Sequence, residues 1–351
     1  MSNTRAKIVL PMRPLGALPP LSVIFGFSAD MQALRQRIEK IASANVPLLI
    51  QGESGTGKNL LAELVHNLSP WAGGSFVKVN CAAIPGTLLE SELFGYEEGA
   101  FTGAMDTKPG RVEMARSGTL FMDEISEVDS GLQAKLLHLL QDGQYSRIGA
   151  QEDRKLEARV ICSTNRVLEE EIKVGRFRQD LFYRINVMSI QVPPLRERAS
   201  DVGVLANYFL EVYNEKYGCQ AESLSPETLE RMHCYHWPGN IRELENLIRR
   251  YVIVGTEDVI CSELRENHRM GNSIEIPLDG SVRLKEVTRK AVKELERKII
   301  LRMLDSNQWN RKHVARALNI SYRALLYKIR EVGLPSRRAR TGHPDLSSDT
   351  D

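Results

Sequence analysis

Residues 52–59 combine glycine, hydroxyl and lysine side chains in the spacing of a phosphate-binding loop. The string Gly-Glu-Ser-Gly-Thr-Gly-Lys-Asn follows an apolar run at 46–50 and precedes leucines that begin a predicted helix. In the order strand, glycine-rich turn, lysine and helix, backbone N–H groups and a helix N-terminus converge on a phosphate. A chance match is the alternative, and the flanking elements argue against it. The predicted ATP-binding residues are Gly52, Glu53, Ser54, Gly55, Thr56, Gly57, Lys58 and Asn59.

Two adjacent carboxylates, Asp123 and Glu124, end the apolar run at 118–122. At the carboxyl edge of a parallel sheet, such a pair lies where ligands bind. We predict that Asp123 holds Mg²⁺ through water and that Glu124 orients the water attacking the γ-phosphate of ATP. Adjacent acids at a strand end are often merely solvated, but the upstream phosphate loop favours a catalytic pair.

The predicted secondary structure changes along the chain from alternating strands and helices to helices alone. Apolar runs at 46–50, 76–80, 118–122 and 159–165 alternate with helical periodicity, which predicts an α/β core with a parallel sheet flanked by helices. Beyond a proline-rich hinge at 192–198, the periodicity is helical throughout, at 202–213, 225–233 and 240–254. The polar stretch 151–157 is predicted to be a surface loop.

The composition bounds the class of protein. The chain has 351 residues, 42% of them hydrophobic and 26% charged, as in soluble globular proteins of two or three domains. No apolar run is long enough to span a membrane. The five cysteines are widely spaced without a C-x-x-C pair, which indicates reduced thiols in a cytoplasmic protein.

Positive charge is concentrated near the C-terminal end. Residues 281–340 hold 17 Lys and Arg against 5 Asp and Glu, a net charge of +12 in a chain whose total is +2. Two short helices at 310–318 and 321–330, with Ser321 capping the second, predict a helix-turn-helix. A basic helical pair for protein contact is the alternative. The predicted DNA-binding residues are Arg311, Lys312, Ser321, Tyr322, Arg323, Tyr327, Lys328 and Arg330.

A glycine-rich hexapeptide lies between the phosphate loop and the acidic pair. It consists of Gly99, Ala100, Phe101, Thr102, Gly103 and Ala104. Alone, it could be an ordinary surface turn. Between two nucleotide motifs, it resembles the signature loop of the AAA+ activators of sigma-54 RNA polymerase, the bacterial enhancer-binding proteins. The resemblance covers residues 23–335, and the C-terminal module resembles the Fis type.

The resemblance implies roles for further residues. Asn80 would report the γ-phosphate state, Asn165 would contact the γ-phosphate or the attacking water, and Arg242 would reach the phosphates as the lid closes. Arg178 and Arg184 match the family's arginine fingers, which act on ATP in a neighbouring subunit. Without the resemblance, these asparagines could be turn-formers and these arginines a salt-bridged surface. The family commonly has glutamate at the position of Asn59, so Mg²⁺ binding on that side differs here.

The implied organisation is an ATPase with a helical lid and an all-α DNA-binding domain. The expected segments are a leader at 1–21, an α/β ATPase subdomain at 22–191, a lid at 192–262, a linker at 263–280, a helix-turn-helix domain at 281–335 and a tail at 336–351. No receiver domain is expected upstream, so control would come from expression or from a partner in trans. The implied assembly is a dimer to hexameric ring.

The resulting hypothesis is a cytoplasmic, ATP-hydrolysing activator that binds double-stranded DNA upstream of promoters. It would use ATP and Mg²⁺ and remodel the sigma-54 RNA polymerase holoenzyme through the hexapeptide loop. A regulator that uses nucleotide only as an allosteric ligand is the main alternative. A protein unfoldase would need a different pore loop and has no use for a helix-turn-helix.

Overall fold

A computed structural model describes residues 18–270, 300, 303–304, 310–318 and 320–331. Residues 1–17 of the expected leader, 271–280 of the expected linker, most of residues 281–309 and the expected tail from 336 lie outside the described residues. Residues 1–268 and 269–351 form two separate units.

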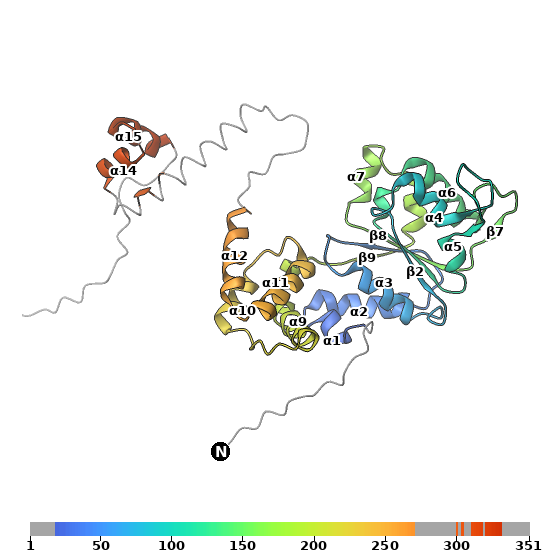
Figure 1. The fold of residues 1–351 in the computed structure, drawn as a ribbon, viewed down its shortest axis with the longest axis horizontal. Helices are drawn as coiled ribbons and strands as arrows, with labels where there is room; N and C mark the ends of the chain where they lie inside the picture. Colours follow the sequence, from blue (N-terminus) through green and yellow to red (C-terminus); the bar gives the residue numbers. More distant parts are fainter. Residues whose placement is uncertain (1–17, 271–299, 301–302, 305–309, 319, 332–351) are drawn as a thin grey trace, which may run out of the picture. The chain divides into compact units, whose positions relative to one another are not determined.

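The first unit is built on a five-stranded parallel sheet (Figure 1). Its strand order is β2-β5-β8-β1-β9. The strands are β1 (Leu48–Gln51), β2 (Phe76–Asn80), β5 (Thr119–Asp123), β8 (Arg159–Thr164) and β9 (Met188–Gln191). Four of these strands coincide with the apolar runs of the sequence, which confirms the predicted α/β core. Strand β9 was not predicted, because its four residues include only two apolar side chains.

Strand register gathers the polar strand ends at one edge of the sheet. Asn80 on β2 pairs with Asp123 on β5, and Gln51 on β1 pairs with Thr164 on β8. All residues of β5 and β8 are buried, because helices cover both faces of the sheet. The edge that follows Gln51, Asn80, Asp123 and Thr164 is therefore the place where loops can build a site.

Successive strand residues face opposite helical layers, as the period of two requires. Leu48, Ile50 and Phe121 pack with α1 (Leu21–Phe25), α2 (Ala29–Ile41) and α3 (Lys58–Asn67). Leu49 and Leu120 pack in a second cluster on the other face. The helices between β2 and β9 are α4 (Gly86–Phe94), α5 (Arg111–Met114), η1 (Ile125–Glu127), α6 (Ser130–Asp142), α7 (Leu168–Lys173) and α8 (Gln179–Ile185).

Two small antiparallel pairs project from this core. The first joins β3 (Gly95–Tyr96) to β4 (Lys108–Pro109), and the hexapeptide lies between them. The second joins β6 (Gln144–Tyr145) to β7 (Arg154–Lys155). Tyr96 also forms a bridge with Ile148, so the two insertions lie side by side.

The lid is helical, as predicted. It comprises η2 (Leu195–Asp201), α9 (Val202–Tyr217), α10 (Pro226–His233), α11 (Asn240–Val254) and α12 (Asp258–Met270). Trp237, 1% exposed, packs in its core, and the Trp237 indole N–H donates to the carbonyl of Met232. Helix α12 continues through residues 263–270, for which a linker was expected.

The second unit contains α14 (Arg311–Ala317) and α15 (Tyr322–Glu331). Ile300, Leu304, Val314, Leu325 and Ile329 form its buried core. The backbone N–H of Ala324 donates to Ser321 Oγ at 3.1 Å, which confirms the predicted cap of the second helix. Within the described residues, no helix has both the length and the apolar character needed to cross a membrane.

Candidate active site

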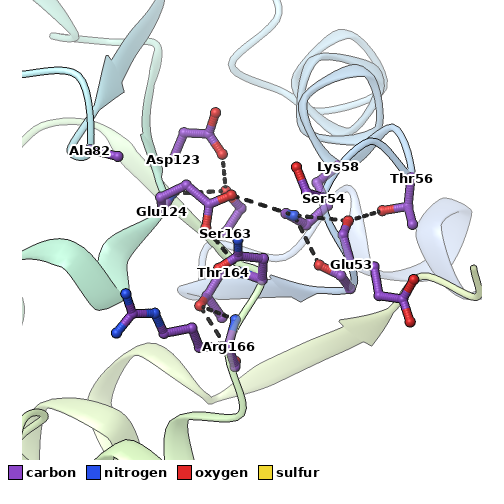
Figure 2. Close-up of polar contacts among 12 residues, drawn as sticks. Glu53, Ser54, Thr56, Lys58, Ala82, Asp123, Glu124, Ser163, Thr164 and Arg166 are labelled. Carbon is purple, nitrogen blue, oxygen red and sulfur yellow. Dashed lines mark hydrogen bonds and ion pairs between the residues drawn. The ribbon is translucent and has the colours of Figure 1, made fainter. Parts of the chain in front are cut away.

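The phosphate loop joins β1 to α3 in a conformation that depends on glycine. Gly55 and Gly57 have φ values of 80° and 98°, in the left-handed region that side chains disfavour. The Lys58 ammonium folds back over the loop and donates to the carbonyls of Gly52 at 2.9 Å and Glu53 at 3.2 Å (Figure 2). Lys58 is 6% exposed, so burial lowers the pKa of its ammonium, an effect that Glu124 and Asp123 oppose.

The predicted acidic pair faces the lysine from the end of β5, which is separated from β1 by β8 in the sheet. Glu124 Oε1 lies 3.7 Å from Lys58 Nζ, and Glu124 Oε2 accepts the backbone N–H of Asn165 at 3.0 Å. Glu124 has a φ of 56°, an unusual value for a non-glycine residue. Ser163 Oγ donates to Asp123 Oδ1 at 2.5 Å, and Lys78 Nζ lies 3.5 Å from Asp123 Oδ2. The structure thus brings the loop and both carboxylates together.

A cleft of about 300 Å³ extends from the phosphate loop toward the lid. Its polar end contains Ser54, Lys58, Asn59, Asp123 and Glu124. Its walls also include apolar side chains that the sequence analysis missed: Pro19, Val23, Ile24, Leu205, Tyr208 and Phe209. A cleft with a charged end and an apolar end suits a nucleotide, whose phosphates and base differ in the same way. No local motif marks these apolar residues, because Pro19 precedes α1 and the others belong to ordinary helical patterns.

Helix α11 of the lid also contributes Ile241, Arg242 and Glu245 to the lining of the cleft. Arg242 Nη1 donates to Ser54 Oγ at 3.0 Å, so this predicted phosphate ligand contacts the phosphate loop. Gly52 and Glu53 do not line the cleft. The Glu53 carboxylate instead accepts from Arg196 and Asn240 of the lid, and only its carbonyl is turned toward Lys58.

The remaining predicted catalytic side chains lie outside the cleft of their own chain. The Asn80 amide oxygen accepts the backbone N–H of Ala82 at 3.1 Å, and Asn165 is exposed beside Glu124. Arg178 is exposed and forms a bidentate ion pair with Asp180, at 2.7 and 3.0 Å. Arg184 donates to the carbonyls of Leu140 and Gln141, the last turn of α6.

The hexapeptide forms an exposed loop tip. Phe101, 45% exposed, packs edge-on against Tyr96, with 4.9 Å between ring centroids. The N–H of Gly99 donates to the carbonyl of Ala104 at 2.9 Å and closes the loop at its base. Thr102 and Gly103 are exposed, whereas Ala104 is buried. The sequence did not single out Met105, which is 83% exposed beside the tip.

Three family models match successive parts of the chain. A sigma-54 interaction domain matches residues 24–191, an AAA+ ATPase lid domain matches 196–275, and a bacterial regulatory protein model of the Fis family matches 291–331. The regulatory protein AtoC of Escherichia coli is 43% identical over 312 residues, which are 88% of this chain and 67% of AtoC. The response regulator protein PilR of Pseudomonas aeruginosa is 38% identical over 89% of this chain and 70% of its own.

The chain belongs to the sigma-54-dependent transcriptional activators of the AAA+ family. It is an ATPase with a helix-turn-helix module. The crystal structure of NtrX from Brucella abortus resembles this activator with a TM-score of 0.66 and 32% identity, over 90% of this chain and 70% of NtrX. NtrX in complex with ATP gives a TM-score of 0.65 at 30% identity, over 88% of this chain and 69% of NtrX. The activator spans about two thirds of the length of AtoC and PilR.

The activator presents its predicted DNA-binding residues on α14 and α15. Ser321, Tyr322, Arg323 and Tyr327 are exposed, and Tyr327 is 69% exposed. Lys312 is exposed, Arg311 and Lys328 are half-buried, and the side chain of Arg330 lies outside the described residues. The exposed positions alternate with buried Leu325 and Ile329, as expected for a helix packed on one face.

Proposed function

We propose that this activator couples ATP hydrolysis to movement of the hexapeptide loop, and that the loop remodels a sigma-54 RNA polymerase closed complex. The observation that carries the proposal is the place of the loop in the chain. It is inserted between β2 and β5, whose paired ends hold Asn80 and Asp123. A change at these strand ends therefore reaches the loop from both of its flanks, through α4 and α5.

The chemistry at the cleft is attack of water on the γ-phosphate. Glu124 orients and polarises the water, while Lys58 neutralises charge on the phosphates. Asp123 and the Asn59 amide both line the cleft, and Mg²⁺ commonly takes one or two protein oxygens, with waters and phosphate oxygens completing its shell. The donor set therefore fits Mg²⁺, which Asp123 and Asn59 would hold and which would neutralise phosphate charge.

Arg178 and Arg184 complete the site of an adjacent subunit. Neither lines the cleft of its own chain, and Arg178 is exposed at the start of α8, as is Tyr183 within it. Because an arginine of one subunit would act on ATP bound to the next, hydrolysis would depend on assembly. This dependence favours a ring, which we propose to be a hexamer. The crystal structure of NtrX in complex with ATP supports the use of ATP by this chain.

The C-terminal module would hold the activator on double-stranded DNA upstream of the promoter. Residues at the start of α15 would enter the major groove, and the surrounding basic residues would contact phosphates. The exposure of Tyr322 and Tyr327 supports this assignment. A helix-turn-helix also favours this function over an unfoldase.

The decisive experiment separates ATP turnover from promoter opening. We expect Phe101→Ala to keep ATPase activity within about twofold and to abolish open-complex formation by sigma-54 RNA polymerase on supercoiled DNA, because the lost ring is at the tip and not at the cleft. Leu68→Ala removes an equally exposed apolar side chain just after α3 and serves as the control. Equal loss of both activities in Phe101→Ala would contradict the proposal. Nucleotide binding without turnover in the wild type would favour the allosteric regulator.

A further inference from the structure

Residues of the lid donate hydrogen bonds to backbone carbonyls of the phosphate loop. Asn240 Nδ2 donates to Ser54 O at 3.0 Å, the backbone N–H of Ile241 donates to Gly55 O at 3.0 Å, and Arg198 Nη2 donates to Thr56 O at 3.0 Å. Three successive loop carbonyls therefore bind the lid. Because phosphates are bound by the N–H groups of such a loop, the same peptide units would serve both the nucleotide and the lid.

Glu53 reinforces this attachment with its side chain. Its carboxylate accepts from Arg196 Nη2 at 2.6 Å on Oε1 and from Arg196 Nη1 at 2.9 Å on Oε2, and Asn240 Nδ2 lies 3.1 Å from Oε2. The bidentate geometry fixes the direction of the guanidinium as well as its distance. Glu53 lies 143 positions from Arg196 in sequence, so the pair joins the phosphate loop to the start of the lid.

Asn240 is the residue at which these contacts meet. It is fully buried, its φ is 53°, and its Oδ1 accepts the backbone N–H of Leu195 at 2.8 Å. A buried non-glycine residue in the left-handed region persists only where its surroundings hold it there. A Cβ atom on Gly55 would lie 2.4 Å from the carbonyl of Gly239, so the close approach of loop and lid also requires glycine at 55.

We propose that Glu53 and Asn240 are positioning residues that set the lid orientation from the phosphate loop. Nucleotide binding by the N–H groups of the loop then orders the lid turn at 237–245. This turn carries Arg242 and forms one wall of the cleft. Glu53 thus acts through the lid and not by touching ATP. The inference rests on the proposed use of ATP at this loop, and it is independent of sigma-54 and DNA.

Hydrogen–deuterium exchange with and without ADP tests the coupling directly, on the full chain. In the wild type, ADP should slow exchange in two peptides, one covering the phosphate loop and one covering the lid turn, where the Ile241 amide is bonded to Gly55. In Glu53→Ala, we expect protection of the loop to remain and ADP-induced protection of the lid turn to fall by at least half. Glu53→Gln keeps an acceptor for Asn240 and should recover part of the coupling.

Steady-state kinetics provide a second readout that general destabilisation would not reproduce. We expect Glu53→Ala to raise the KM for ATP about tenfold while kcat changes less than about threefold, because the misplaced lid weakens nucleotide binding in both the ground and transition states. Glu227→Ala removes a carboxylate that pairs with Arg231 at 2.6 Å on the lid surface, away from the loop, and should leave KM and lid protection unchanged.

Unchanged lid protection by ADP in Glu53→Ala would overturn the proposal. If that variant does not fold, Arg196→Met removes the other half of the ion pair. Full ADP-induced protection of the lid turn in both Arg196→Met and Glu53→Gln would also contradict the proposal. These assays contain no polymerase, so their outcome is separate from that of Phe101→Ala.

Discussion

Glu124 Oε1 lies 3.7 Å from Lys58 Nζ, so the carboxylate and the ammonium at the polar end of the cleft already form an ion pair. The pair joins the end of β5 to the first residue of α3. The second carboxylate oxygen is held by the backbone N–H of Asn165. Because both oxygens have partners, the carboxylate has a defined direction before ATP binds. A γ-phosphate at Lys58 would share this cation with Glu124.

Glu124→Gln should separate ATP binding from hydrolysis. The amide keeps the shape of the side chain but cannot polarise water as a carboxylate does, so we expect kcat to fall about 10²- to 10⁴-fold. Affinity for ATP should stay within about threefold, because the phosphate loop is unchanged. Single-turnover hydrolysis and equilibrium binding of a fluorescent ATP analogue measure the two effects. A kcat near the wild-type value would show that Glu124 takes no part in hydrolysis.

Arg178→Ala should abolish hydrolysis in homogeneous assemblies, with a fall in kcat of about 10³- to 10⁵-fold. Its side chain pairs with Asp180 and does not line the cleft of its own chain. If it acts on the neighbouring subunit, mixing Arg178→Ala with Glu124→Gln chains should restore activity at mixed boundaries. Titrating one variant against the other measures this. Absence of any recovery, with mixed assembly verified by native mass spectrometry, would place both residues in one subunit's site.

Arg147→Met should uncouple ATPase activity from movement of the hexapeptide loop. The Arg147 guanidinium donates to both Glu113 oxygens, at 2.6 and 2.9 Å, and to Glu97 Oε1 at 3.0 Å. It thereby ties the base of the loop to α5 and to the β6–β7 insertion. Arg147 is only 10% exposed, and its removal leaves Arg154, which is 36% exposed and lies 3.2 Å from Glu113 and 4.0 Å from Glu97, as the remaining cation between the two carboxylates. We expect promoter opening to fall at least about tenfold with ATPase activity within about threefold.

Arg116→Met is the matched control for Arg147, because it removes an arginine that pairs with Glu157 at 2.6 Å on an exposed surface. Its promoter opening should equal that of the wild type. Parallel loss of ATPase activity and opening in Arg147→Met would show a general effect on the α/β core.

His66→Gln should flatten the dependence of stability on pH. Burial and the nearby charge of Arg159 lower the pKa of His66 from its ordinary value of 6.5. The unfolded chain therefore binds this proton at a higher pH than the folded chain, and the free energy of unfolding falls as pH drops through 6.5. Gln keeps a partner for Thr119, whose Oγ1 lies 2.9 Å from His66 Nδ1. Urea unfolding at pH 7.5 and 5.5 measures the difference.

The exposed His138 on α6 is the control for this effect, as His138→Gln. The wild type and His138→Gln should lose the same stability between the two pH values, and His66→Gln should lose less. An equal loss in all three proteins would assign the pH dependence to other groups.

Sites that are made of consecutive residues could be predicted from the sequence. The phosphate loop, the acidic strand end, the hexapeptide and the Ser321 cap each depend on backbone conformation and hydrogen bonds within a few positions, so their spacing is informative. Runs of apolar residues predicted four of the five sheet strands. The register that sets Asn80 beside Asp123 follows from parallel strands ending at one edge.

Contacts between side chains that are far apart in sequence could not be predicted in this way. Glu53 belongs to the phosphate loop by sequence, but its carboxylate binds Arg196 and Asn240, because the lid packs on that side. Leu205, Tyr208 and Phe209 follow an ordinary helical pattern and become cleft walls only through the position of α9. Such contacts join residues far apart in sequence, and their formation depends on the packing of whole elements, which no local pattern of residues specifies.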